Sequence, residues 1–286
     1  MNLTNGIIIG LVQGLTEFIP VSSSGHLVIA EKIVSLSAPP VTVAVFVHLG
    51  TLAAVLLVYW RRLWGMLQSL LPGRDQERML NRRLILMLIL GSIPAAIAGL
   101  TLADVFEAAF SSLPLVGGML ILTGFFLLVG SRAGSSRRRI RVTRSGRALG
   151  GSGGGQEGVG LLQIRWWQAI IVGLFQALAI FPGLSRSGTT ISSGLLTGLA
   201  PAAAADFSFL LSVPTILGAA AVDLLHLGGA VQFNSQLGVA TVVAALSGLV
   251  AIQVVLNTVR ARRLAVFIPY CWVVGVLLLV FSAVRG

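Results

Sequence analysis

Cysteine and charged side chains are scarce in this 286-residue chain. Its one cysteine, Cys271, rules out a disulfide framework and a cysteine-based metal site. Only 10% of the residues are charged and nine are acidic, which is far below the usual content of a soluble domain. No Lys or Arg precedes Lys32, so we do not expect a secretory signal peptide with a basic start.

Long apolar runs take the place of the missing charges. Hydrophobic residues make up 56% of the chain, and the mean hydropathy is +0.94. Because about 20 apolar residues cross a hydrocarbon core, we expect an all-α polytopic membrane protein with six transmembrane helices. They are expected near 40–60, 83–103, 113–130, 207–225, 236–258 and 265–284. Two further apolar segments, 5–21 and 167–184, run into clusters of Pro, Gly and Ser and are interpreted as re-entrant helices.

The net charge of +11 could indicate a nucleic-acid partner, but its placement favours a membrane explanation. Seventeen of the 20 Lys and Arg lie in three predicted loops, 61–83, 132–165 and 260–263, whereas 104–112 and 226–235 contain none. The positive-inside rule accounts for this alternation and places the basic loops in the cytoplasm. No nucleic acid is expected, since no basic stretch is interleaved with aromatic residues.

The chain repeats itself across a basic, glycine-rich stretch at 131–165, which we interpret as a flexible cytoplasmic linker. With an offset of 163 residues, "IIGLVQGLTEFIPVSSSG" (8–25) matches "IVGLFQALAIFPGLSRSG" (171–188) at nine of eighteen positions. The single membrane domain, 1–286, therefore divides into repeats 1–130 and 166–286. Each repeat has one broken segment and three spanning helices. Since three is odd, we expect an inverted-topology repeat whose two re-entrant segments meet near the midplane, where such folds place their sites.

The first broken segment carries an unusual set of polar residues in "QGLTEFIPVSSSGH". An ionisable residue at membrane depth indicates a functional site, and Glu17 lies one helical turn after Gln13; a Glu that snorkels or caps a helix is the alternative. Hydroxyls at a helix start can bind an anion. A histidine one turn on adds an acid, base or nucleophile. The candidates here are Gln13, Glu17, Ser22, Ser23, Ser24 and His26.

The second broken segment, "PGLSRSGTT", places an arginine among hydroxyls. A guanidinium at such a helix start suits the forked binding of phosphate oxygens. An ion pair of Arg186 with Glu17 or Asp206 is the other interpretation, and the two are compatible. His48 is interpreted as a satisfied core histidine. The candidates from this half are Ser185, Arg186, Ser187 and Thr189, so the pooled set resembles a phosphate site in a lipid setting.

These two motifs resemble the signature regions of the undecaprenyl-diphosphate phosphatase family, the bacitracin-resistance proteins of the BacA type. "FVHLGTLAAV" (46–55) and "FSFLLSVP" (207–214) are also similar to family sequence. The resemblance implies hydrolysis of undecaprenyl diphosphate to undecaprenyl phosphate and inorganic phosphate, which recycles the carrier lipid for peptidoglycan synthesis and confers bacitracin resistance. It implies a multi-pass protein of the bacterial plasma (inner) membrane whose active site opens toward the outer face. One departure is Ala44, where family members often carry an acidic residue.

The resemblance also implies roles for the pooled residues. Glu17, Ser23, His26 and Arg186 are the expected catalytic residues. Phosphate binding is expected from Ser22, Ser24, Ser185, Arg186, Ser187 and Thr189. A divalent cation, Mg²⁺ or Ca²⁺, is expected near Glu17 and Gln13.

Several alternatives stay open at this point. The nucleophile is Ser23 activated by His26, His26 itself, or a metal-bound water. A lipid-phosphate flippase or anion transporter is the alternative function, because broken helices in inverted repeats also build transporters. The expected partners are the lipid substrate and the bilayer, and a homodimer is left open.

Overall fold

The computed structural model describes residues 3–33, 40–73, 75–142, 158–226 and 234–285. Within these ranges the regular structure is helical, apart from one isolated bridge between Val159 and Leu199. The helices of the first half are α1 (Leu3–Phe18), α2 (Ser23–Ile33), α3 (Pro40–Ser69), α4 (Gln76–Thr101), α5 (Ala103–Phe110) and α6 (Leu113–Val142). Those of the second half are α7 (Trp166–Leu178), α8 (Arg186–Leu196), α9 (Pro201–His226), α10 (Ser235–Arg260) and α11 (Ile268–Arg285), with short 3₁₀ turns η1 (Leu161–Gln163) and η2 (Leu264–Phe267).

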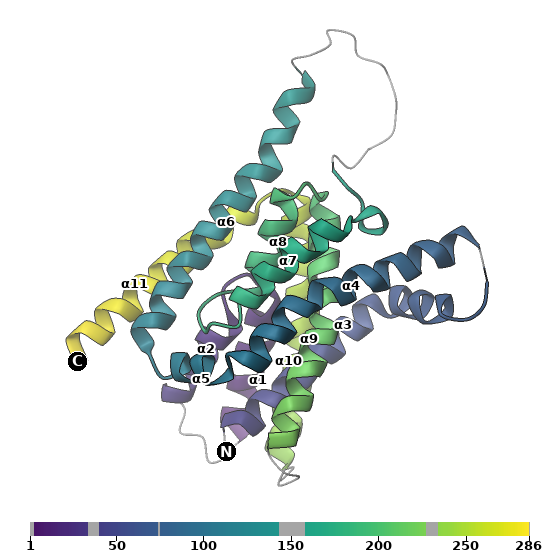
Figure 1. Cartoon of the computed structure of the whole chain (residues 1–286). Coiled ribbons are helices and arrows are strands. Elements are labelled where there is room, and N and C mark those ends of the chain that lie inside the picture. The colour runs from purple at the N-terminus through teal and green to yellow at the C-terminus, as the bar shows by residue number, and fades with distance from the viewer. Residues whose placement is uncertain (1–2, 34–39, 74, 143–157, 227–233, 286) are drawn as a thin grey trace.

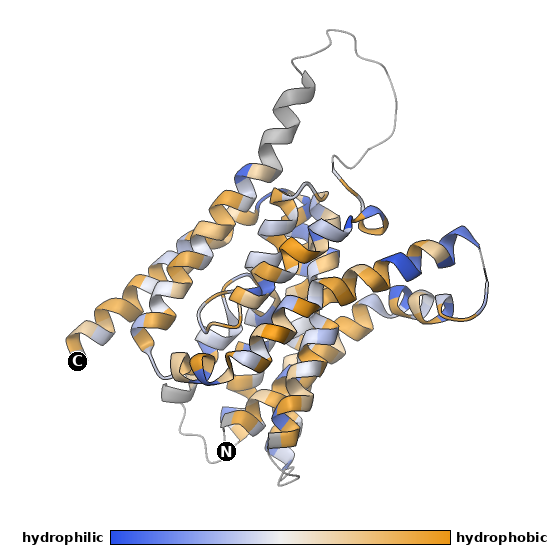
Figure 2. Cartoon of the chain, in the orientation of Figure 1, coloured by the Kyte–Doolittle hydropathy of each residue, from blue (hydrophilic) through white to orange (hydrophobic). Residues whose placement is uncertain are grey.

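Six helices are long and apolar enough to cross a membrane, which confirms the six predicted spans. They are Val41–Ser69, Gln76–Thr101, Leu113–Ala133, Pro201–Leu225, Ser235–Arg260 and Leu264–Val284. Large apolar side chains cover their outer faces, as at Leu57, Ile97 and Val273. Figure 2 shows that apolar residues predominate along the long helices. An exterior of this kind suits lipid rather than water.

The short helices α7 and α8 lie between α6 and α4 (Figure 1). Helices α6 and α11 pack together on one side, and α3 and α4 contact each other on the other side. The packing follows the sequence repeat: α1 packs on α10 as α7 packs on α4, and α3 contacts α10 as α9 contacts α4. The predicted repeat is therefore a repeat of structure as well as of sequence.

Several spanning helices extend beyond their predicted ends. Arginines predicted in a loop at 61–83 lie mostly on helices, since α3 continues to Ser69 and α4 begins at Gln76. Arginine is a good helix former, and its long side chain reaches polar surroundings from a helix end. Arg82 donates to the carbonyls of Leu71 (2.8 Å) and Gly73 (3.0 Å). The α3–α4 connection is consequently short and held by hydrogen bonds.

Both ends of the predicted linker at 131–165 belong to regular structure. Helix α6 continues to Val142. On the other side, Val159 donates to the carbonyl of Gly198 and accepts from the amide of Ala200, both at 3.0 Å. The glycine-rich remainder, 143–157, lies outside the described residues. The predicted linker, 131–165, is therefore too long. At its start the basic stretch after 130 continues helix α6, and at its end the chain already forms η1.

In both broken segments a serine caps the start of the second helix. The hydroxyls of Ser22 and Ser185 accept hydrogen bonds from the amides of Gly25 (3.2 Å) and Gly188 (3.1 Å). Such caps satisfy amides that a helix start leaves free. In the second break Gly183 has a φ of 94°, a left-handed conformation that glycine adopts without a steric cost. These bonds begin α2 and α8 at equivalent places.

Close helix contact depends on Gly173, the counterpart of Gly10 in the repeat. A Cβ at Gly173 would clash with the backbone carbonyl of Gly91 on α4, and a Cβ at Gly10 would clash with that of Ala240 on α10. We expect Gly173→Ala to lower the free energy of unfolding by about 1–3 kcal/mol, the usual cost of overpacking. Thermal unfolding of the detergent-solubilised protein measures this loss of stability.

Gly118→Ala is the matched control, because a Cβ at this helical glycine meets nothing within 4 Å. That variant should be unchanged or slightly stabilised, since alanine is the better helix former. Equal losses in both variants would contradict the close-contact argument.

Candidate functional site

Glu17 lies at the centre of a buried polar cluster. It occupies the last turn of α1 and is 7% exposed. Arg186 Nη2 lies 2.5 Å from its Oε1, while Ser23 Oγ donates to Oε2 at 2.5 Å and Gln13 Nε2 donates to Oε2 at 3.0 Å. The predicted ion pair between Glu17 and Arg186 is thereby confirmed. It joins the two halves of the chain across 169 positions.

The two helix breaks face each other. A Cβ on Gly25 would lie 3.1 Å from the Cα of Gly183, and one on Gly188 would lie 3.4 Å from the Cβ of Pro20. This contact brings the start of α8 to the end of α1. Arg186 reaches Glu17 for that reason, and of the two ion-pair partners that the sequence offered, Glu17 is the one it contacts.

His48 lies beside the cluster, a position that the sequence did not indicate. Its Nε2 lies 3.8 Å from Glu17 Oε2 and its side chain is 34% exposed. Its Nδ1 bonds the carbonyl of Ala44 at 2.7 Å. The interpretation as a satisfied core histidine missed this contact with Glu17. The signal available was the position of His48 in "FVHLGTLAAV", one of the segments that resembled family sequence.

The remaining serines and Thr189 mainly stabilise the helix starts. Ser22 and Ser24 hydroxyls lie 3.2 Å apart, and Ser185 and Ser187 hydroxyls repeat that distance. Thr189 Oγ1 donates to the carbonyl of Arg186 at 3.0 Å. These side chains are buried or half-buried. The hydroxyls predicted to bind phosphate thus also hold the backbone around the cluster, and Ser23 is the serine that contacts Glu17.

His26 forms its hydrogen bonds outside the Glu17 cluster. Its Nδ1 lies 2.7 Å from the carbonyl oxygen of Ser22, and its Nε2 lies 2.7 Å from the hydroxyl of Tyr270 on α11. Because a carbonyl only accepts, Nδ1 carries a proton. The two rings also stack, with centroids 5.6 Å apart. Within the described chain, no hydrogen bond joins His26 to Ser23.

Thr123 on α6 is another residue that the sequence analysis did not single out. Its Oγ1 accepts from the amide of Ser185 (2.9 Å) and donates to the carbonyl of Gly183 (3.1 Å). The side chain is fully buried. Thr123 thus holds the backbone on which Arg186 sits, and a lone threonine in an apolar run carries no sequence signal for that role.

Two buried polar atoms of the cluster have no protein partner. These are Gln13 Oε1 and Arg186 Nη1. A buried polar atom without a hydrogen bond is costly, so each of the two is a candidate contact for a ligand. Arg186 Nη1 supplies a cationic donor and Gln13 Oε1 a neutral acceptor.

Glu17 and Gln13 carry oxygen donors of the kind that a hard divalent cation accepts. Among the described residues, no group of three or more His, Cys, Asp or Glu is arranged to hold a metal ion. Glu17 supplies one carboxylate and Gln13 one unpartnered amide oxygen. Mg²⁺ commonly uses one or two carboxylates together with substrate phosphates and water. The protein alone therefore supplies a partial ligand set.

Curated relatives match nearly the whole chain. An "Undecaprenyl-diphosphatase" of Syntrophotalea carbinolica is 40% identical over 96% of this chain and 97% of its own length. Proteins of the same description from Halothermothrix orenii and Desulforapulum autotrophicum are 34% and 36% identical. These cover 99% and 97% of this chain, and 100% and 97% of their own lengths. The family model described as "Bacitracin resistance protein BacA" matches residues 6–277. With both polar motifs, five of the six spans and most of the sixth inside the match, the chain belongs to the BacA family of bacitracin resistance proteins.

Proposed function

We propose that the protein hydrolyses undecaprenyl diphosphate to undecaprenyl phosphate and inorganic phosphate. The observation that carries the proposal is the contact of Glu17 with both Ser23 and Arg186 at the junction of the two broken segments. Relatives that match the chain end to end bear the name of this activity. Like its family, the protein recycles the carrier lipid for cell-wall synthesis and confers bacitracin resistance.

Arg186 binds the terminal phosphate in this proposal. Its Nη2 holds Glu17 and its Nη1 is buried without a partner, so Nη1 is available for a phosphate oxygen. A guanidinium held in place by an ion pair needs little reorganisation as charge develops during the reaction. The apolar exteriors of the spanning helices accommodate the lipid tail.

Ser23 is the proposed nucleophile and Glu17 its base. Their hydrogen bond of 2.5 Å supports direct proton transfer as Ser23 Oγ bonds the terminal phosphorus and undecaprenyl phosphate leaves. Water then attacks the phosphoserine: its hydroxyl joins phosphorus, its proton goes to Ser23 Oγ, and Glu17 releases its proton to solvent. His26 positions α2 against Tyr270 in this scheme and does not activate Ser23.

A divalent cation, Mg²⁺ or Ca²⁺, is part of the proposal. Glu17 and Gln13 would hold it, and when bound it would neutralise charge on the phosphate oxygens. The protein residues bind and orient the diphosphate around that charge.

The proposed location is the bacterial inner membrane with the site open to the outer face. The basic residues near 61–83 and 260–263 support a cytoplasmic position for that end of the bundle. Helices α1 and α7 have 16 and 13 residues, shorter than the ~20 needed to span the hydrocarbon core. Their length supports re-entrant paths, and the odd number of spans in each repeat supports entry from opposite faces.

Phosphate release by the purified chain in detergent tests the proposal. We expect inorganic phosphate from undecaprenyl diphosphate and none from undecaprenyl phosphate. The alternative of a lipid-phosphate flippase or anion transporter is not favoured, because the relatives that match the chain are named for hydrolysis. Lipid movement in vesicles without any phosphate release from a folded preparation would contradict the proposed hydrolysis.

A further inference from the structure

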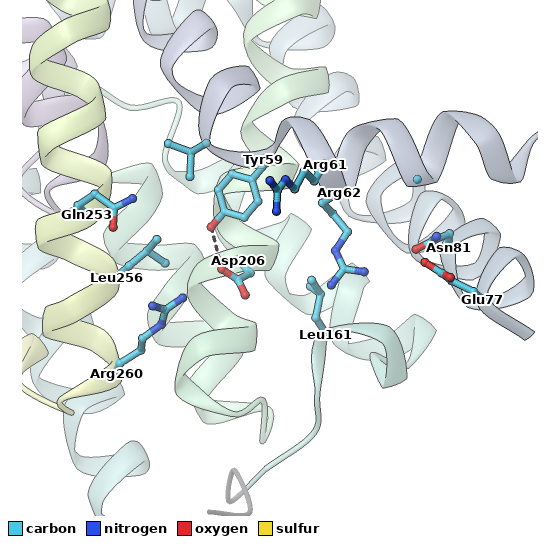
Figure 3. Close-up of a pocket in the computed structure, with 12 residues that line it drawn as sticks. Tyr59, Arg61, Arg62, Glu77, Asn81, Leu161, Asp206, Gln253, Leu256 and Arg260 are labelled. Carbon is cyan, nitrogen blue, oxygen red and sulfur yellow. Dashed lines mark hydrogen bonds between the residues drawn. The ribbon is translucent and has the colours of Figure 1, made fainter.

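A polar cavity, here called the arginine pocket, opens between α3, α4, α9 and α10. Its volume is about 500 Å³, and its lining includes Arg61, Arg62, Arg260, Tyr59 and Asp206. Figure 3 shows Arg62 and Arg260 approaching Asp206 from different helices. A volume of this size suits a small ligand or a lipid headgroup.

The arginine pocket is separate from the Glu17 cluster. Tyr59 follows His48 by eleven residues on α3, which is about 16 Å along the helix axis at 1.5 Å per residue. The ring of Phe209 lies between, 5.6 Å from Phe18 and 6.4 Å from Tyr59. Phe18 and Phe209 are fully buried, so an apolar layer divides the two sites.

The pocket has more cationic than anionic groups. Three arginines face two carboxylates, Asp206 and the exposed Glu77. Asp206 accepts a hydrogen bond from the hydroxyl of Tyr59 at 2.7 Å. In the described chain, no carboxylate lies within 4.0 Å of the guanidinium groups of Arg61, Arg62 or Arg260. These arginines are therefore available to an added anion.

Tryptophans next to the pocket indicate its level in the membrane. Trp60 and Trp64 lie one turn apart on α3 and are 57% and 56% exposed. The guanidinium of Arg61 lies 5.5 Å from the Trp60 ring centroid. Exposed tryptophans gather at the headgroup level of a bilayer. The pocket beside them consequently faces headgroups rather than acyl chains.

We propose that the arginine pocket binds the phosphate of an anionic phospholipid headgroup. Arg62, which is half-buried, and Arg260 hold the phosphate from α3 and α10, and Arg61 adds charge at the rim. Arginine suits this task because its planar fork matches phosphate oxygens. The bound lipid joins α3, α9 and α10 at the arginine-rich end of the bundle. This site does not depend on the proposed hydrolysis.

Native mass spectrometry of the full chain in detergent tests the proposal, with phosphatidylglycerol as the probe and phosphatidylcholine as the comparison lipid. We expect one phosphatidylglycerol retained in preference to phosphatidylcholine. Arg260→Gln should weaken retention about tenfold, as expected for loss of a hydrogen bond to a charged group. Arg62→Gln/Arg260→Gln should abolish it.

Arg263→Gln is the matched control, since Arg263 is exposed, three residues from Arg260 and absent from the pocket lining. Arg62→Lys/Arg260→Lys keeps the charge, and weakened binding in that folded variant would support the forked contact. Equal retention of both lipids, or equal losses in Arg260→Gln and Arg263→Gln, would overturn the proposal. Binding of inorganic phosphate without binding of phosphatidylglycerol would overturn the lipid assignment.

Discussion

Arg186→Ala should lower phosphate release from undecaprenyl diphosphate by at least about 100-fold, the usual effect of removing one donor that stabilises transition-state charge. Arg186 supplies the buried, unpartnered Nη1 at the cluster. The same change leaves Glu17 buried without its counter-charge, which costs about 3–5 kcal/mol of stability in comparable pairs. Initial rates and the midpoint of thermal unfolding in detergent measure the two effects.

A double variant separates the loss of chemistry from the loss of stability. In Arg186→Ala/Glu17→Gln the uncompensated charge is gone, so the unfolding midpoint should recover. Its activity should stay low, because both Arg186 and the proposed base Glu17 are missing. Arg263→Ala removes an exposed arginine outside the cluster and should retain activity. If the stabilised double variant also regained activity, Arg186 would have no direct role in the reaction.

Ser23→Ala should abolish turnover, with a loss of at least about 1,000-fold, because removal of a nucleophile leaves only binding and charge stabilisation. Ser24→Ala is the matched control. Ser24 lies next in sequence but contacts the Ser22 hydroxyl at 3.2 Å rather than Glu17. We expect it to lose much less activity, and mainly through KM. Rates for both variants at saturating substrate provide the comparison.

A phosphoenzyme experiment tests the same assignment by another route. Undecaprenyl diphosphate labelled at its terminal phosphate should transfer the label to Ser23 in rapidly quenched reactions. Label on His26 would contradict the proposed nucleophile. Full turnover by folded Ser23→Ala would favour attack by water instead.

Much of the architecture could be predicted because it depends on local sequence. Apolar length predicts a spanning helix, and the six predicted spans are confirmed. Helix ends were less predictable, as at Ser69 and Val142, because arginine-rich sequence favours both a loop and the polar end of a helix. The caps of Ser22 and Ser185 follow from residues a few positions apart, and the repeat indicated that they would match.

The membrane class, the repeat and the two polar motifs were thus determined by the sequence alone, since each depends on composition or on neighbours along the chain. Tertiary structure decided which polar groups meet. It paired Glu17 with Arg186 across 169 positions, brought His48 beside Glu17, and turned His26 toward Tyr270. Sequence spacing predicts the face of a helix on which a side chain lies, whereas its partner depends on how helices far apart in the chain pack together.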